Sequence, residues 1–141
     1  MPQEIKQGSL TWREAMRFDG GAPGGPSTTI DADNRQAPGP MLTLLLAAAG
    51  CSGADVVSIL QKMRVGLSGL RIDVAGTRRE EEPRRYVGIH FTFHLSGSGL
   101  DETKARRAID LSLQKYCSVI HSLAPDIRVT YDLRVVQEGR T

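Results

Sequence analysis

The sequence predicts an α+β fold in which antiparallel sheet packs on two long helices. Two segments have the length and apolar content of long helices, and several shorter runs are typical of strands. The predicted order is two or three strands, a helix, two strands, a helix and a closing strand. It lacks the regular strand–helix alternation of a doubly wound parallel sheet. With 141 residues, of which 40% are hydrophobic, a single domain over 1–141 with a buried core is expected.

The N-terminal part is predicted to form two strand regions. An approximate alternation of apolar residues indicates a strand or short hairpin over 7–19, and a further strand is expected over 27–31. The glycine- and proline-rich stretch over 20–26 is typical of a turn or a mobile loop. A polar loop is expected over 32–39.

The first long helix is expected to begin at Pro40. Backbone N–H groups in the first turn of a helix have no acceptor within the helix, so a proline, which has no N–H, is well tolerated there. The helix should run over 41–64 and end at Gly66. Its first half is apolar on all sides, which predicts burial on all sides. A membrane span needs about 20 apolar residues, but this run is interrupted near its middle, so a helix buried in protein is expected and a membrane is not. The interrupting residues are Gly50, Gly53 and Asp55.

Two strands should follow, over 70–77 and 86–95, joined by the charged connection 78–85. The second of these strands shows the clearest alternation of apolar and other residues in the chain. It places Tyr86 on the face opposite Phe91.

The second helix is predicted over 102–123, with Asp101 as its N-cap and Pro125 as its stop. A closing strand is expected over 127–136. One face of this helix should carry an apolar stripe formed by Ile109, Leu113, Tyr116, Cys117 and Ile120.

Charge and composition exclude several classes of function. The net charge of +2, with basic residues interleaved with acids, does not favour nucleic-acid binding. No signal peptide is visible over 1–8, so a cytoplasmic location is expected. His90 and His94 share one face of a strand, but neither cysteine has the close-spaced partner typical of zinc sites. We therefore expect neither a metal nor another cofactor.

The two cysteines, Cys51 and Cys117, lie on the two predicted helices. In a reducing compartment they are either inert core residues or a redox pair. On the pattern alone a packing role is favoured, because free cysteine is among the most buried residue types. If the helices pack side by side, the two sulfurs can meet. Small residues around Cys51 would permit this close approach: Ala47, Ala48, Ala49, Gly50 and Gly53.

Two segments resemble the two cysteine motifs of the OsmC/Ohr superfamily, in its OsmC-like branch. They are 40–64, PMLTLLLAAAGCSGADVVSILQKMR, and 112–123, SLQKYCSVIHSL. Segments 78–83 and 106–113 look like the same branch, and the resemblance covers most of the chain from Trp12 onward. It implies an OsmC-like fold with antiparallel sheets wrapped around two long central helices. It also implies an intertwined homodimer with two sites at the subunit interface.

The resemblance further implies thiol-dependent reduction of organic hydroperoxides. Cys51 matches the peroxidatic position, at which a thiolate attacks the terminal oxygen, releases an alcohol and becomes a sulfenic acid. Cys117 matches the resolving position, which condenses with the sulfenic acid to a disulfide. A dithiol reductant then restores both thiols.

In the peroxidases that this chain resembles, an arginine and a glutamate together stabilise the thiolate. Arg17 is the nearest candidate for the arginine, with Arg13 second. The glutamate is absent, since its expected positions hold Met41 and Leu42. The sequence therefore supports the cysteine pair better than it supports fast catalysis.

The peroxidase is expected to have an apolar pocket lined by Met41, Leu44, Leu45 and residues of the partner chain. Two other functions stay open. The chain could instead be a non-catalytic dimer that binds a small apolar ligand in a pocket at its interface. It could also be a structural dimer whose cysteines are packing residues. Asp55, one turn after Cys51, is expected to have a structural role, either capping backbone or pairing with an arginine.

Overall fold

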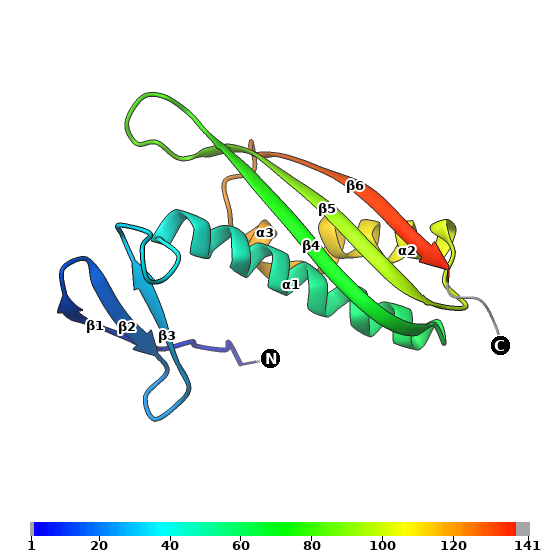
Figure 1. Ribbon diagram of the computed structural model, residues 1–141, viewed down its shortest axis with the longest axis horizontal. Helices are drawn as coiled ribbons and strands as arrows, with labels where there is room; N and C mark the ends of the chain where they lie inside the picture. Colours follow the sequence, from blue (N-terminus) through cyan, green and yellow to red (C-terminus); the bar gives the residue numbers. More distant parts are fainter. Residues whose placement is uncertain (1, 138–141) are drawn as a thin grey trace. The chain divides into compact units, whose positions relative to one another are not determined.

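The computed structural model describes residues 2–137 (Figure 1). The chain forms two compact units, divided after Leu44. The helix α1 (Pro40–Lys62) runs through this division. The expectation of one domain stays a prediction.

The N-terminal unit contains an antiparallel sheet in the order β1-β2-β3, formed by β1 (Ser9–Glu14), β2 (Arg17–Gly21) and β3 (Ser27–Asp31). The hairpin and the later strand are thus confirmed. The strand β2 extends two residues into the stretch predicted as a loop. Gly21 makes this possible, because a Cβ there would lie 2.2 Å from the carbonyl oxygen of Pro26.

The loop that precedes α1 is held by the buried carboxylate of Asp31. Its two oxygens accept backbone N–H groups of Asp33, Arg35 and Gln36 at 2.9, 3.3 and 3.0 Å. These bonds, that from Gln36 above all, hold the pKa of Asp31 below its usual value because they favour the charged form. The predicted loop over 32–39 is confirmed, and it is an ordered turn structure.

The helix α1 begins at Pro40 as predicted but ends before the expected glycine. Arg64 adopts a positive φ of 62°, and the amide of Val65 donates to the carbonyl of Leu60 at 3.0 Å, which closes the C-terminus. Gly66 instead begins the next strand. Burial on all sides is wrong for the single chain, since Leu42 and Leu46 are 39% and 48% exposed.

By length and composition α1 could cross a membrane, and 33% of its most apolar window is buried. Core helices of water-soluble proteins pass the same test. The buried face of α1 contributes Leu45, Val56 and Leu60 to the core, which agrees with a helix packed in protein.

The C-terminal unit has a sheet in the order β4-β5-β6, formed by β4 (Gly66–Arg78), β5 (Tyr86–Ser98) and β6 (Arg128–Gln137). The helices lie along one face of it (Figure 1). β4 and β5 are antiparallel as predicted, but β5 and β6 are parallel, so the expectation of a purely antiparallel sheet is wrong. A parallel pair needs a long crossover, and the second helical region supplies it.

The second helical region is broken where one continuous helix was predicted. Asp101 caps α2 (Glu102–Leu111) as expected, accepting the amide of Lys104 at 2.8 Å. A π-helical turn, η1 (Ser112–Tyr116), follows, and after one extended residue the short α3 (Ser118–His121) completes the region. Because the π turn inserts a residue, the expected stripe is displaced and Tyr116 is 49% exposed.

The core of this unit lies between the helices and the sheet. Alternate residues of β5 enter it, as their period predicts: Ile89, Phe91, Phe93 and Leu95. Tyr86 is also buried, contrary to the simple alternation, because the register with β4 shifts between Thr77 and Arg78.

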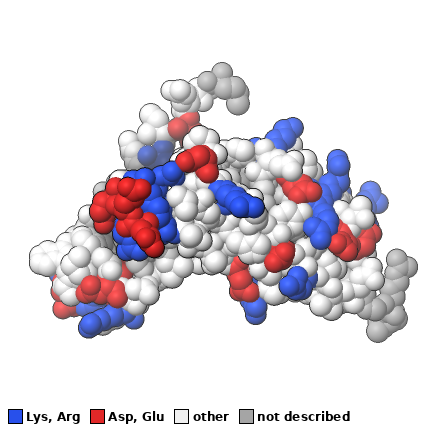
Figure 2. All heavy atoms as spheres, turned by 90° about the horizontal axis from the view of Figure 1, so that it is seen from above, with Lys and Arg blue, Asp and Glu red and all other residues white. Residues whose placement is uncertain are grey.

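The charged connection between β4 and β5 is stabilised by its own backbone. Arg79 donates to the carbonyl of Pro83 at 2.7 Å, and Arg78 to that of Arg84 at 2.7 Å. Arg85 forms an ion pair with Asp126 at 2.6 Å. Figure 2 shows acidic and basic side chains next to one another over the visible face.

Candidate functional site

The two cysteines lie on neighbouring helical segments of the C-terminal unit. Cys51 is half-buried near the middle of α1, whereas Cys117 is fully buried, with 0% exposure, at the break between η1 and α3. The Cys117 thiol reaches α1 at the carbonyl of Ala48, three residues before Cys51 in the sequence. Both are free thiols and the sulfurs are not at disulfide distance.

The thiol of Cys117 points back toward α1. Its Sγ donates to the carbonyl of Ala48 at 3.9 Å, and its amide donates to the carbonyl of Ser112 at 2.7 Å. The pKa of Cys117 is raised to about 11, mainly because burial deprives the thiolate of its hydration, with smaller contributions from the neighbouring Cys51 and Asp55. Cys117 is therefore a protonated thiol at neutral pH.

The small residues around Cys51 have different neighbours from those expected. Ala48 is the one beside Cys117. Gly53 instead faces the sheet, since a Cβ there would lie 3.2 Å from Ile72 of β4. Gly50 is exposed, and a Cβ at that position would meet nothing within 4 Å.

Asp55 joins a hydrogen-bonded cluster that links the two cysteine-bearing segments. The Ser112 hydroxyl donates to Asp55 Oδ2 at 2.9 Å and is also bonded to Ser52 Oγ at 2.9 Å. Both serines are fully buried. The expected partners of Asp55, a backbone group or an arginine, are thus wrong. Sequence reasoning missed Ser112, although a serine between apolar positions of a helix is a signal for such a partner.

Arg17 and Arg13 lie on the hairpin of the N-terminal unit. The guanidinium of Arg17 contacts the Glu14 carboxylate and the Gln36 side-chain oxygen, while Arg13 pairs with Asp19 at 2.9 Å. These side chains surround a hollow of about 410 Å³. The placement of Arg17 beside a cysteine stays a prediction.

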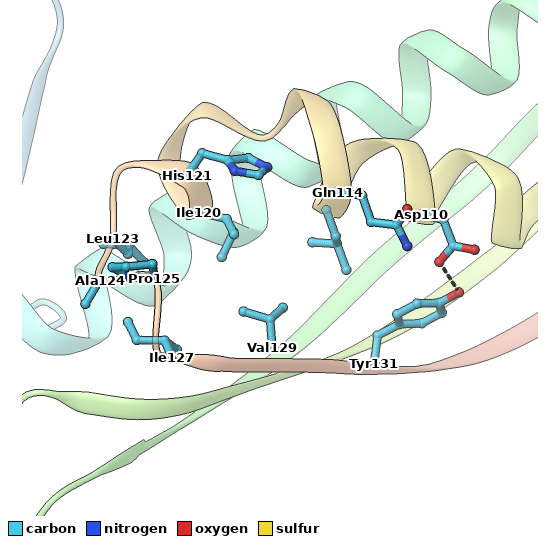
Figure 3. A pocket seen from close by; sticks show the side chains of 11 residues that line it. Asp110, Gln114, Ile120, His121, Leu123, Ala124, Pro125, Ile127, Val129 and Tyr131 are labelled. Atoms are coloured by element: carbon cyan, nitrogen blue, oxygen red, sulfur yellow. Dashed lines mark hydrogen bonds between the residues drawn. The ribbon is translucent and has the colours of Figure 1, made fainter.

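A second hollow, of about 380 Å³, lies between the segment running from α2 to α3 and the strand β6 (Figure 3). Its walls are mainly apolar, and Tyr131 donates to Asp110 at 2.8 Å at one end. The sequence did not predict this hollow, because its walls come from segments whose packing depends on the break at Cys117. Its lining includes Ile120, Leu123, Ile127, Val129, Gln114 and His121.

The two histidines of β5 are bound to side chains on the outer face of the sheet. His90 contacts Thr130 and Asp132 at 2.7 and 3.2 Å, and His94 contacts Asp73 at 2.9 Å. In the part of the chain that the structure describes, His, Cys, Asp and Glu form no cluster of three suited to a metal.

Comparison with known proteins identifies the fold and the family. The family model described as "OsmC-like protein" matches residues 32–132. Protein YhfA of Escherichia coli K12 is 38% identical over 131 residues, which cover 92% of this chain and 98% of that protein.

Three solved structures are similar over nearly the whole chain. A protein from Aquifex aeolicus VF5 has a TM-score of 0.86 and 28% identity, covering 97% of this chain and 100% of its own. The OsmC-like protein of Mycoplasma pneumoniae has a TM-score of 0.78 and 16% identity, with coverages of 98% and 100%. The organic hydroperoxide resistance protein OhrB of Bacillus subtilis has a TM-score of 0.61 and 14% identity, with coverages of 92% and 98%. The α+β arrangement of helices and two sheets is shared with these structures, and this chain belongs to the OsmC-like protein family.

Proposed function

We propose that this protein reduces organic hydroperoxides with Cys51 and Cys117 as its redox pair. The observation that carries the proposal is that a partly exposed thiol and a buried one lie on two adjacent helical segments, which are joined by hydrogen bonds from Cys117 and Ser112 to α1. Membership of the OsmC-like family supports it, as does the likeness of fold to an organic hydroperoxide resistance protein.

The proposed reaction has three steps. The thiolate of Cys51 attacks the terminal oxygen of ROOH, the O–O bond breaks, and the released alkoxide takes a proton to become the alcohol ROH. The thiol of Cys117 then attacks the sulfur of the Cys51 sulfenic acid and releases water as the disulfide forms. A dithiol reductant finally transfers two electrons and two protons to restore both thiols.

The division of labour follows from exposure and protonation. Cys51 is the more accessible thiol, so it meets the hydroperoxide. Cys117 is buried and its pKa is raised to about 11, so it stays a neutral thiol that waits for the sulfenic acid.

Arg17 is proposed as the cation that stabilises the Cys51 thiolate. Met41 and Leu42 occupy the positions where the resemblance leads one to expect a glutamate, but Glu14 contacts the Arg17 guanidinium from the neighbouring strand. We propose that Glu14 replaces the missing glutamate in holding Arg17. The reaction would then depend on a carboxylate that comes from β1 rather than from α1.

The protein is proposed to act as a cytoplasmic homodimer. Exposed leucines on α1, Leu42 and Leu46, offer apolar surface for a second copy. Its function requires neither nucleic acid nor a membrane. The free thiols fit a reducing compartment.

Cysteine variants test the proposal. Cys51→Ser should stop consumption of cumene hydroperoxide, because no nucleophile remains. Cys117→Ser should consume about one equivalent and then stall at the sulfenic acid. Hydroperoxide turnover by Cys51→Ser at the native rate would refute the proposal.

A second function, binding of a small apolar ligand without catalysis, is favoured by the hollow between the helices and β6 (Figure 3). Apolar walls with a few polar groups at one end are typical of ligand sites. It predicts that native mass spectrometry of the purified protein detects a retained small molecule. Empty protein with rapid hydroperoxide turnover would reject this alternative.

A further inference from the structure

We propose that Asp55, acting through Ser112, is a positioning residue that holds Cys117 in place for disulfide formation with Cys51. The inference rests on the proposed redox pair but concerns a residue outside it. Among the described residues Asp55 makes no hydrogen bond to either sulfur, so any positioning of Cys117 by Asp55 passes through Ser112.

Ser112 is the point at which the two cysteine-bearing segments are joined. Its hydroxyl bonds to Asp55 and Ser52 of α1, each at 2.9 Å, and its carbonyl accepts the amide of Cys117 at 2.7 Å. One residue thus fixes α1 through its side chain and the start of the Cys117 turn through its backbone.

The π-helical turn makes this anchor important for the direction of the thiol. It runs from Ser112 to Tyr116 and ends at Cys117, whose φ and ψ of −69° and 99° are extended rather than helical. In this conformation the Cys117 thiol reaches the Ala48 carbonyl of α1. If Ser112 were free of α1, the turn could relax toward ordinary helical spacing, which would rotate the thiol away from Cys51.

The cluster is buried at its centre and open at one side. Ser112 and Ser52 have 0% exposure, whereas Asp55 is half-buried. A hollow of about 470 Å³ lies beside Asp55, with Lys62 of α1 and Arg107 of α2 in its lining. Water or these cations can therefore bind one oxygen of the Asp55 carboxylate while the other oxygen accepts the hydrogen bond from the Ser112 hydroxyl. The carboxylate thus need not lose all of its hydration to make this hydrogen bond.

Two properties of Asp55 could act on Cys117: its hydrogen bond to Ser112 and its negative charge. Positioning requires only the hydrogen bond. An asparagine retains a carbonyl oxygen that can accept from Ser112 and removes the charge, whereas an alanine removes both. The pair Asp55→Asn and Asp55→Ala therefore separates the two effects.

The test uses an aromatic disulfide, 5,5′-dithiobis(2-nitrobenzoic acid), in place of a hydroperoxide. The Cys51 thiolate breaks the S–S bond of the reagent, forms a mixed disulfide and releases one nitrothiobenzoate. Cys117 then attacks the Cys51 sulfur, forms the protein disulfide, and releases a second nitrothiobenzoate and a proton. Absorbance resolves the two releases, so the second rate measures the attack by Cys117.

Asp55→Ala and Ser112→Ala should slow the second release by about 10- to 100-fold, the effect expected of a small misplacement of a reacting group. The first release should be unchanged within about threefold, since Cys51 needs no help from Cys117 for it. Asp55→Asn should keep the second release within about threefold of the native rate. A general loss of structure would alter both releases rather than slow the second release alone.

Glu102→Ala is the control. Glu102 is a carboxylate of α2 that pairs with Arg106 at 2.9 Å and lies outside the hollows described above. It should leave both releases unchanged. Circular dichroism shows whether Ser112→Ala folds. If it does not, the comparison of Asp55→Ala with Asp55→Asn is sufficient to test the proposal.

A second release at the native rate in Asp55→Ala would overturn the proposal, and so would an Asp55→Asn variant as slow as Asp55→Ala. Because no hydroperoxide is used, this result is independent of the peroxidase proposal. A native protein that completes both releases but leaves cumene hydroperoxide intact would contradict the peroxidase and leave the role of Asp55 supported.

Discussion

The amide of Cys117 donates to the carbonyl of Ser112 at 2.7 Å, five residues back along the chain. This spacing is one residue longer than that of an α-helix, and the extra residue directs the Cys117 thiol toward α1. Deletion of the exposed residue Gln114 should restore α-helical spacing and turn Cys117 away. After treatment with hydroperoxide, intact mass should then show Cys51 with one added oxygen, about 16 Da, rather than a disulfide. Disulfide formation at the native rate in the deletion variant would show that the π turn is not needed.

The raised pKa of Cys117 predicts how stability depends on pH. Burial lifts this pKa from 9.0 for the free thiol to about 11, so the folded protein binds the proton more tightly than the unfolded chain does. The associated stability is fully present below about pH 9 and is lost progressively as the pH rises through about 11.

Unfolding by urea under reducing conditions checks this dependence. Between pH 8 and pH 11 the native protein should lose more free energy of unfolding than Cys117→Ala does. Only the native protein has a buried thiol at this position, which ionises more readily in the unfolded chain than in the fold. The tyrosines with raised pKa values, Tyr86 and Tyr131, are the same in both proteins and cancel in the comparison. Equal losses in the two proteins would mean that Cys117 ionises as freely in the fold as in water.

Arg17 should govern the first chemical step. Arg17→Ala should slow the loss of the first thiol to cumene hydroperoxide by roughly 100-fold, the cost of removing one charged stabilising group. Glu14→Gln should slow it less, because the arginine remains but loses an ionic partner. Arg71→Ala serves as the control, since Arg71 is an exposed arginine that pairs with Asp73 on β4 at 2.9 Å. If Arg17→Ala reacts as fast as Arg71→Ala, Arg17 has no part in the site.

The buried carboxylate of Asp31 should hold the loop that leads into α1. Asp31→Ala removes the acceptor of three backbone amides, so hydrogen exchange of the Gln36 amide should accelerate by roughly tenfold or more. The exposed neighbour Asp33 provides the control variant Asp33→Ala, which should leave that exchange unchanged. Because the pKa of Asp31 is lowered, the carboxylate stays charged and protects the loop above about pH 4, and the protection fades as the pH falls below that value and Asp31 is protonated. Equal exchange in the two variants would exclude this role.

Local patterns predicted most of the elements. The proline at the start of α1, the Asp101 cap of α2 and the alternation along β5 each act within a few residues, so the sequence alone was sufficient to place them. The end of α1 was misplaced by a few residues because Arg64 rather than Gly66 adopts the positive φ.

The errors concern features that depend on contacts distant in sequence. The parallel pairing of β6 with β5 depends on where the crossover returns the chain, which strand patterns do not encode. The π turn was missed because one inserted residue leaves a helical pattern intact on either side of it. The bond between Ser112 and Ser52 joins residues 60 apart, and neither serine belongs to a short motif.

The cysteine site was predicted partly from the residues and partly from the family resemblance. The placement of Cys51 and Cys117 on two neighbouring helical segments was predicted, but the two sulfurs are not at disulfide distance, and neither Gly50 nor Gly53 lies at the contact between the segments. The protonated state of Cys117 was not predicted, because it depends on complete burial, which the sequence does not give residue by residue.

Titration of the purified, reduced protein with cumene hydroperoxide, followed by free-thiol counting and intact mass, tests the redox pair most directly. A working pair loses both thiols at near-stoichiometric hydroperoxide, with a mass decrease of about 2 Da per chain, and Cys51→Ser loses neither. Thiols that persist in the native protein at a large excess of hydroperoxide would contradict the proposed activity.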